Sequence, residues 1–271
     1  MRYIQLTIVM VILGLMAGGV SGKPLPGKET KEDKFIARNG AKSGSTVEEK
    51  EQHLVQSAKM EKATRMPVYK PPKRGAPGGR VGGGTRGDAG IHLMTHVLAP
   101  GQVRGLTSQD QPDLYWYVSK STNVPIEFTL IDEDGIEPLV ETRLPSPVEA
   151  GIQRIRLSDF GVRLSPEKMY RWSVALILDP EHRSKDLVAS ARIQRALPSE
   201  VPKNVSEHSD AVEATFIHAE AGLWYDAIAA ISRAIKESPE ETRLQQIRNA
   251  LLDQVNLEEV ARFDRIAKKK F

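Results

Sequence analysis

The stretch DLYWYVS, residues 113–119, decides how the chain is expected to fold. In an extended strand its side chains alternate, with Leu114, Trp116 and Val118 on one face and two tyrosines on the other. Such alternation of large apolar residues is typical of a strand that buries one face. The stretch therefore predicts a β-strand whose tryptophan points into a core.

Other short stretches of apolar residues surround it, and each is bounded by turn residues. They are DAGIHLMTHVLAP (88–100), PIEFTLID (125–132), PLVETRL (138–144), GIQRIRL (151–157), YRWSVALILD (170–179) and LVASARIQR (187–195). The pair Asp134 and Gly135 predicts a tight turn between two of them. Six or seven short strands predict an immunoglobulin-like antiparallel β-sandwich over residues 91–197, with Trp116 and Trp172 as core residues.

After Pro198 the apolar period becomes helical. Ala227, Ile231, Ala234 and Pro239 have the offsets of the second helix of a tetratricopeptide repeat. The period of 34 residues also recurs, because Gly222, Leu223 and Ala227 are matched by Asn256, Leu257 and Ala261. We therefore expect residues 205–271 to form a short tetratricopeptide-like segment of three or four helices. Fewer than three repeats are rarely stable alone, so the segment is expected to dock on the sandwich.

The beginning of the chain has the pattern of a secretory signal over residues 1–22. Arg2 is followed by an uncharged apolar run that ends in the small residues of VSG, 20–22. An uncleaved membrane anchor is the alternative interpretation. The sequence contains no cysteine, which excludes disulfides, thiolate metal sites and a cysteine nucleophile. These features favour a periplasmic or extracellular protein of a Gram-negative bacterium.

Residues 23–90 are polar, rich in Pro and Gly, and predict a disordered basic arm. From Lys23 to Gly87 there are 15 Lys and Arg residues against 7 Asp and Glu, whereas Asp88 to Phe271 has 22 against 28. Such an arm is typical of a solvated linker, or of a segment that binds an acidic polymer or anionic surface. Arg74, Arg80 and Arg86 are the candidate contacts for an acidic partner. Export makes nucleic acid an unexpected target.

The arm also contains the spacing G-x-G-x-x-G at Gly82, Gly84 and Gly87. A dinucleotide or phosphate loop needs these glycines between a strand and the first turn of a helix. Here they follow a run of prolines and precede a predicted strand, so we expect an extended lead-in to the sandwich. No cofactor is expected.

Metal-binding and catalytic patterns are weak. His92 and His96 are four residues apart, which in a strand separates them by roughly 13 Å, too far to share an ion. The loop with Asp179, Glu181, His182 and Asp186 is a candidate for a weak calcium site or a solvated hairpin. We find no G-x-S-x-G elbow and no metalloprotease helix. No catalytic residue is therefore assigned, and a hydrolase stays a third hypothesis that requires a polar cleft.

The whole pattern resembles a bacterial family known only as Domain of Unknown Function 928 (DUF928). Four segments carry the resemblance: YKPPKRGAPGGRVGGGTRG (69–87), GLTSQDQPDLYWYVS (105–119), YRWSVALILDPEHRSKDL (170–187) and GLWYDA (222–227). The resemblance implies an exported, non-enzymatic protein, and it brings no known activity or ligand.

The favoured hypothesis is a protein-interaction scaffold or adaptor whose partner is another envelope protein, since such folds usually present surfaces to proteins. Trp224 and Tyr225 are the candidate partner contacts beside the helices. The alternative is that both side chains pack the helices onto the sandwich. Binding of an acidic polymer through the basic arm is the second hypothesis. Contact with a membrane is expected only if the N-terminal segment stays uncleaved.

Overall fold

The computed structural model describes residues 64–72, 80–84, 93–203 and 210–267. The chain divides into two units, Met1–Thr64 and Arg65–Phe271, and all the strands and helices given below belong to the second. The predicted signal segment, residues 1–22, lies outside the described residues. In the described ranges no helix has the length and apolar character needed to cross a bilayer.

Within the described residues, nine strands and four α-helices follow one another. The strands are β1 (Gly83–Gly84), β2 (Met94–Val97), β3 (Gly105–Thr107), β4 (Asp113–Val118), β5 (Ile126–Asp132), β6 (Pro138–Arg143), β7 (Gly151–Arg156), β8 (Met169–Leu176) and β9 (Leu187–Arg195). The helices are α2 (Ala211–Glu220), α3 (Trp224–Glu237), α4 (Thr242–Gln254) and α5 (Glu258–Ala267). The chain is therefore a mixed α/β protein, with the helices after the strands as the sequence predicted.

The strands form two sheets. One has the order β1-β2-β4-β7 and is antiparallel throughout, and the other has the order β3-β9-β8-β5-β6. In the second sheet β3 runs parallel to β9, so the expectation of purely antiparallel strands is wrong for this pair. The chain passes from β2 in one sheet to β3 in the other, rather than turning back in a hairpin, and a strand that arrives in this way is free to lie parallel to its neighbour.

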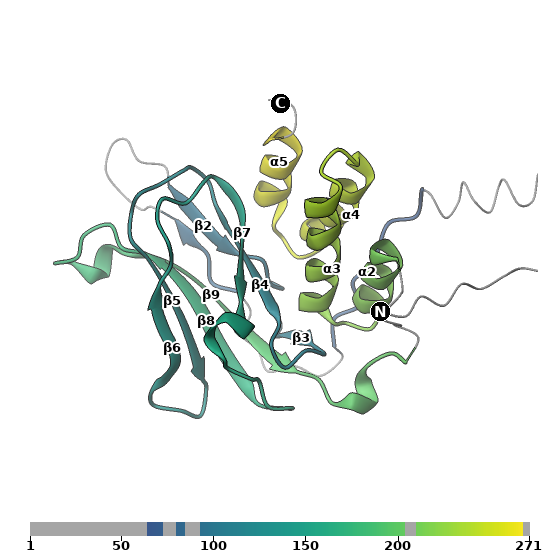
Figure 1. The fold of residues 1–271 in the computed structure, drawn as a ribbon, viewed down its shortest axis with the longest axis horizontal. Helices are drawn as coiled ribbons and strands as arrows, with labels where there is room; N and C mark the ends of the chain where they lie inside the picture. The colour runs from purple at the N-terminus through teal and green to yellow at the C-terminus, as the bar shows by residue number, and fades with distance from the viewer. Residues whose placement is uncertain (1–63, 73–79, 85–92, 204–209, 268–271) are drawn as a thin grey trace, which may run out of the picture. The chain divides into compact units, whose positions relative to one another are not determined.

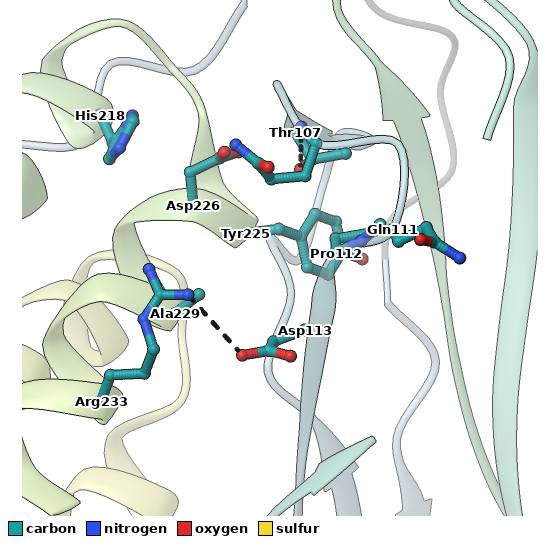
Figure 2. Close-up of a pocket in the computed structure, with 10 residues that line it drawn as sticks. Thr107, Gln111, Pro112, Asp113, His218, Tyr225, Asp226, Ala229 and Arg233 are labelled. Carbon is teal, nitrogen blue, oxygen red and sulfur yellow. Dashed lines mark hydrogen bonds and ion pairs between the residues drawn. The ribbon is translucent and has the colours of Figure 1, made fainter. Parts of the chain in front are cut away.

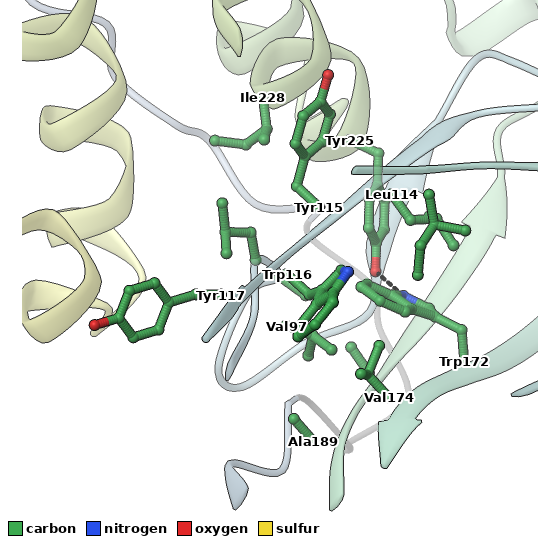
Figure 3. Packing of buried hydrophobic residues seen from close by; sticks show 14 of the residues in the cluster. Val97, Leu114, Tyr115, Trp116, Tyr117, Trp172, Val174, Ala189, Tyr225 and Ile228 are labelled. Atoms are coloured by element: carbon green, nitrogen blue, oxygen red, sulfur yellow. Dashed lines mark hydrogen bonds between the residues drawn. The ribbon is translucent and has the colours of Figure 1, made fainter. Parts of the chain in front are cut away.

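The inner faces of the two sheets share one apolar core (Figure 3). Trp116 of β4 and Trp172 of β8 are 1% and 0% exposed, which confirms both as core residues. The predicted alternation in β8 is also confirmed, because Tyr170, Trp172 and Val174 are buried while Arg171 is exposed. The turn at Asp134 and Gly135 lies between β5 and β6, where the Gly135 amide donates to the Asp132 carbonyl.

The helices add a third layer on the outer face of the four-stranded sheet (Figure 1). Tyr115 and Tyr117, on the second face of β4, are buried under them, with 6% and 2% of their surface exposed. Phe263 of α5 packs edge-on against Tyr117, with ring centres 5.2 Å apart. Strand β4 is therefore covered on both faces, which explains why all its residues after Asp113 are buried.

The turns within the helical layer repeat. Gly222, between α2 and α3, has φ = 78°, and Asn256, between α4 and α5, has φ = 58°. Both residues occupy the left-handed region, which glycine and asparagine adopt at the lowest cost. The two turns are 34 residues apart, so the sequence period corresponds to a repeated helix–turn–helix geometry.

Part of the predicted arm is packed on this fold. The Gln254 side chain accepts from the Tyr69 amide at 2.9 Å and donates to the Pro67 carbonyl at 2.9 Å. The Lys70 amide donates to the Ala219 carbonyl of α2 at 3.0 Å. Extending the arm to residue 90 is therefore wrong for residues 65–72 and 80–84, because they pair with the helices and sheets. The rest of the arm lies outside the described residues.

Candidate functional site

The segment GLWYDA, residues 222–227, joins the helices to the sheets. A side chain at Gly222 would place its Cβ 2.7 Å from the Lys70 carbonyl oxygen, so only glycine fits between α2 and the packed 65–72 segment. Next to it, the Trp224 indole N–H donates to the Leu98 carbonyl at 2.8 Å. Its ring meets the Tyr69 ring edge-on at 5.0 Å. Trp224 therefore fixes α3 to both the sheet and the packed 65–72 segment.

Tyr225 reaches between the two sheets (Figure 3). Its hydroxyl accepts from the Trp172 indole N–H at 2.8 Å and donates to the Arg192 carbonyl at 3.2 Å. Burial raises the pKa of Tyr225, so the hydroxyl keeps the proton that it donates. Beneath the ring, a Cβ added at Gly105 would lie 2.4 Å from Tyr225 Cε2. Glycine at the start of β3 is therefore required by this ring.

Asp226 completes the attachment. Its carboxylate accepts from the Ser108 amide at 2.9 Å and from the Ser108 hydroxyl at 2.5 Å. The side chain is 5% exposed, and bonds to a buried carboxylate are stronger than those between neutral groups. The segment after β3 is thereby held to the first turn of α3.

These contacts correct the prediction that Trp224 and Tyr225 bind a partner. They are 0% and 2% exposed, and they cannot offer a surface to another protein in this structure. Their contacts instead favour the alternative interpretation, in which they pack the helices onto the sheets. Aromatic side chains with a polar tip suit this position, because the ring fills the core while the tip finds a hydrogen bond.

Arg80 is also corrected as a contact for an acidic partner. Its guanidinium donates to the carbonyls of Ala99 at 3.1 Å and Asn256 at 2.8 Å, and more weakly to Val255 at 3.4 Å. It therefore binds the carboxyl end of α4, where a cation is favourable. Burial lowers the pKa of Arg80, and nearby Glu258 partly opposes this. Arg74 and Arg86 lie outside the described residues.

The glycine-rich stretch does not open a helix where it is described. Gly83 and Gly84 form β1, which pairs with β2, and a Cβ at Gly82 would lie 3.2 Å from the His96 ring. Gly87 lies outside the described residues. The described part is an extended lead-in to the sheet, as the sequence predicted.

The metal candidates have other partners. His96 Nε2 lies 3.7 Å from Glu259, and burial lowers the pKa of the ring, while His92 lies outside the described residues. In the acidic loop, Asp179 accepts from His182 and Lys185, and Asp186 pairs with Arg183. Across the described ranges, no three acidic, histidine or cysteine side chains gather in a way that could hold a metal ion.

A small polar pocket lies where the helices meet the sheets, and we call it the junction pocket (Figure 2). Its volume is about 100 Å³. Arg233 of α3 approaches Asp113 of β4 at 3.9 Å across it. Its wall includes the side chains of Thr107, Gln111, Asp113, His218, Asp226 and Arg233.

The junction pocket contains the acid and base groups that a hydrolase requires, but not in a catalytic arrangement. The Ser108 hydroxyl donates to Asp226, and among the described residues the buried Nδ1 of His218 has no hydrogen-bond partner. Burial, with a contribution from Arg233, lowers the pKa of His218, and Asp226 opposes the shift. A triad needs the nucleophile bonded to the base, and ligand sites usually exceed about 300 Å³.

A larger groove, here called the β7 groove, runs between β7 and the helices α3, α4 and α5 and has a volume of about 530 Å³. Residues 150–154 form one wall, and Arg233, Ile235, Lys236, Phe263 and Asp264 stand opposite. Arg248 makes two bonds to Asp264, at 3.0 and 2.6 Å, which brace α4 against α5. The groove therefore has a braced helical wall and a lining of mixed apolar and cationic side chains.

Neither cavity was found from the sequence. Arg154 and Arg233 are 79 residues apart in the sequence, one in a strand and one in a helix, and only the packing of the third layer brings both near Asp113. The segment GLTSQDQ (105–111) was the one available signal, because Gly105, Thr107 and Ser108 all belong to the junction.

The part of the chain that matches a known family coincides with the sheets and most of the helices. A search of the curated proteins finds no match. The profile of a family described as Domain of Unknown Function (DUF928) matches residues 81–264, which hold all the strands from β1 to β9 and the helices from α2 to α4. The matched region therefore includes both cavities and the residues that attach the helices to the sheets. The chain belongs to the DUF928 family.

Proposed function

We propose that this chain is an exported, non-enzymatic adaptor of the bacterial cell envelope, which binds another protein at the β7 groove. The groove carries the proposal. Its volume is about 530 Å³, within the range of roughly 300–1,000 Å³ that is usual for small-molecule sites, so it has room for a few side chains of a partner. Its lining joins apolar residues, such as Ile235 and Phe263, to charged ones.

The rigidity of the groove supports the same function. One wall belongs to the sheets and the other to the helices, and the two layers share a core through Trp224 and Tyr225. A binding surface whose walls are already fixed loses less conformational entropy when a partner binds. A flexible linkage between the layers would instead raise the entropy cost of binding a partner.

We also propose that the two sheets form an immunoglobulin-like sandwich. The order β3-β9-β8-β5-β6, with β3 parallel to β9, corresponds to the order A′-G-F-C-C′ of such domains, and β2-β4-β7 corresponds to A-B-E. Antibody domains join strands B and F by a disulfide. In this cysteine-free chain the corresponding strands carry the buried Trp116 and Trp172.

A tetratricopeptide-like origin of the helices is likewise proposed. Its support is the matching left-handed turn at Gly222 and Asn256, with α3 and α5 beginning at equivalent positions after each. Repeats of this kind commonly bind peptides and proteins. This resemblance is an analogy of fold, and the groove itself supplies the chemistry.

Two other functions have less support. The hypothesis that the basic arm binds an acidic polymer loses one of its three candidate contacts, because Arg80 is bonded to the carboxyl end of α4. The polar junction pocket favours the hydrolase hypothesis, but the Asp226 carboxylate in that pocket accepts two hydrogen bonds from Ser108.

The test is site-specific photocrosslinking of the full chain in cells of the source bacterium. Removing residues 205–271 would expose the core, so single positions are more informative than truncation. A photoreactive residue at Lys236, an exposed position in the groove, is expected to give a discrete protein adduct. The same residue at Arg143, exposed on β6 in the other sheet, is the matched control. Absence of an adduct at position 236, or the same adducts at both positions, would contradict the adaptor function.

A further inference from the structure

Strand β7 forms one edge of the four-stranded sheet, and this edge borders the β7 groove. In the described residues, β4 is the only strand hydrogen-bonded to it. Side chains of a strand alternate between its two faces, yet the consecutive residues 151–154 all line the groove. The groove therefore follows the main chain of β7 along its open edge, rather than one face of the sheet.

The other sheet edges are less suited to pairing. Strands β1 and β3 have two and three residues, and β6 carries Pro138 and exposed charges at Glu141 and Arg143. Short strands, prolines and charges are the devices by which proteins block edge pairing. Strand β7 has six residues without a proline, and its two exposed charges, Arg154 and Arg156, are both positive, so among the described edges it is the one suited to an added strand of opposite charge.

The charge of the groove indicates what it accepts. Arg154 and Arg233 share a single carboxylate, Asp113, at 3.6 and 3.9 Å. No ion pair is formed by Lys236 within the described part of the chain. Since Arg248 is neutralised by Asp264, the lining and Asp113 leave two positive charges uncompensated.

Apolar side chains line the groove beside these charges. Ile152 lies on the sheet wall, and Ile235 and Phe263 on the helix wall. An extended segment presents side chains alternately to opposite sides, so it can place apolar residues against these positions and carboxylates near the cations. Strand addition of this kind takes its affinity from main-chain bonds and its specificity from pockets for alternate side chains.

We propose that the β7 groove binds an extended acidic segment of the partner protein, which adds to the sheet as a strand beside β7. This proposal rests on the adaptor function and names the chemistry of its partner. Lys236 and Arg233 recognise the carboxylates, and the edge of β7 supplies the main-chain hydrogen bonds.

The test uses the full mature chain and two synthetic pools of fluorescein-labelled eight-residue peptides. One pool alternates Asp or Glu with Val, Ile or Leu, and the matched pool has Lys or Arg in place of the acidic residues. Fluorescence anisotropy is expected to show binding of the acidic pool alone, weakening as salt rises. Lys236→Glu is expected to reduce that binding about tenfold, whereas Arg143→Glu leaves it unchanged. Thermal unfolding of each variant shows whether it remains folded.

A second measurement needs no variant. The tightest acidic peptide is N-methylated on its even or on its odd amides. Because only alternate amides of an edge strand face its neighbour, one methylated series is expected to lose binding and the other to keep it. Equal tolerance of both series, or equal binding of the acidic and basic pools, would overturn strand addition. If these peptides fail while the crosslink at position 236 persists, the adaptor function stands and the strand proposal falls. If the crosslink is absent, the adaptor function itself fails.

Discussion

Replacing Gly105 by alanine tests how the helices are fitted to the sheets. The added Cβ would lie 2.4 Å from Cε2 and 3.0 Å from Cδ2 of Tyr225. Non-bonded carbon atoms are comfortable at about 3.5 Å, so the ring must move by about 1 Å. Tyr225 is buried between the sheets, and the only space that its residue borders among the described cavities is the small junction pocket of about 100 Å³.

The cost follows from this displacement. Overfilling a packed core costs about 1–3 kcal/mol. A shift of about 1 Å also stretches the Trp172–Tyr225 hydrogen bond beyond its useful range, a further loss of about 1 kcal/mol. We expect Gly105→Ala to lower the free energy of unfolding by about 2–4 kcal/mol, and the melting temperature by roughly 5–15 °C for a folded unit of this size.

The assay is urea unfolding followed by tryptophan fluorescence, since all three tryptophans are buried in the core. Gly101→Ala is the matched control, because a Cβ there meets nothing closer than 3.4 Å and its φ is not in the left-handed region. A second variant, Tyr225→Leu, removes the ring. Combined with Gly105→Ala, it should cost less than the sum of the two single changes.

Equal unfolding free energies for Gly105→Ala and Gly101→Ala, within about 0.5 kcal/mol, would refute the proposed fit between the helices and the sheets. Strict additivity of Gly105→Ala and Tyr225→Leu would refute the contact between those two residues.

Three further predictions concern buried polar groups. Asp226→Asn weakens the hydrogen bonds from Ser108 and should lower the free energy of unfolding by about 1–2 kcal/mol. The same change should cost much less in a Ser108→Ala background. Full additivity of the two changes would contradict the pairing of Asp226 with Ser108. Arg248→Leu leaves the partly buried Asp264 without its cation and should cost about 2–3 kcal/mol in urea unfolding. A melting temperature equal to that of the unaltered chain would be the adverse result. Burial lowers the pKa of His218 below its ordinary value of 6.5. The unfolded chain therefore binds a proton below about pH 6.5 that the folded chain refuses, so stability falls as pH drops from 7 to 5, and His218→Gln should make that slope shallower, which urea unfolding at each pH measures.

The sequence predicted the elements whose evidence is local. Alternation places Trp116 and Trp172 in the core because a strand sends every second side chain to the same face. The helical turn at Gly222 is also local, since it depends on a residue that tolerates a left-handed backbone. The prediction of three or four helices after the strands rests on the same kind of periodic pattern.

Features that depend on which element covers which could not be predicted in this way. Period two shows that Tyr115 and Tyr117 lie on the second face of β4, but not that helices cover this face. The same limit applies to Trp224, whose burial depends on a sheet more than a hundred residues earlier in the chain. Arg80 looked like a solvated cation because the carbonyls that bind it lie at the other end of the sequence. The β7 groove arises only where these layers meet.

The ties between the two ends of the chain also bear on how it folds. The Tyr69 amide and the Gln254 side chain are separated by 185 residues, and Arg80 and the Asn256 carbonyl by 176. Contacts between residues so distant in sequence form slowly, because most of the chain entropy is lost before they are made. We therefore expect the native state to close late, only after α4 has been synthesised. A chain that remains open until nearly its full length is available would suit the export proposed above, since it could cross a membrane unfolded and complete its fold on the other side.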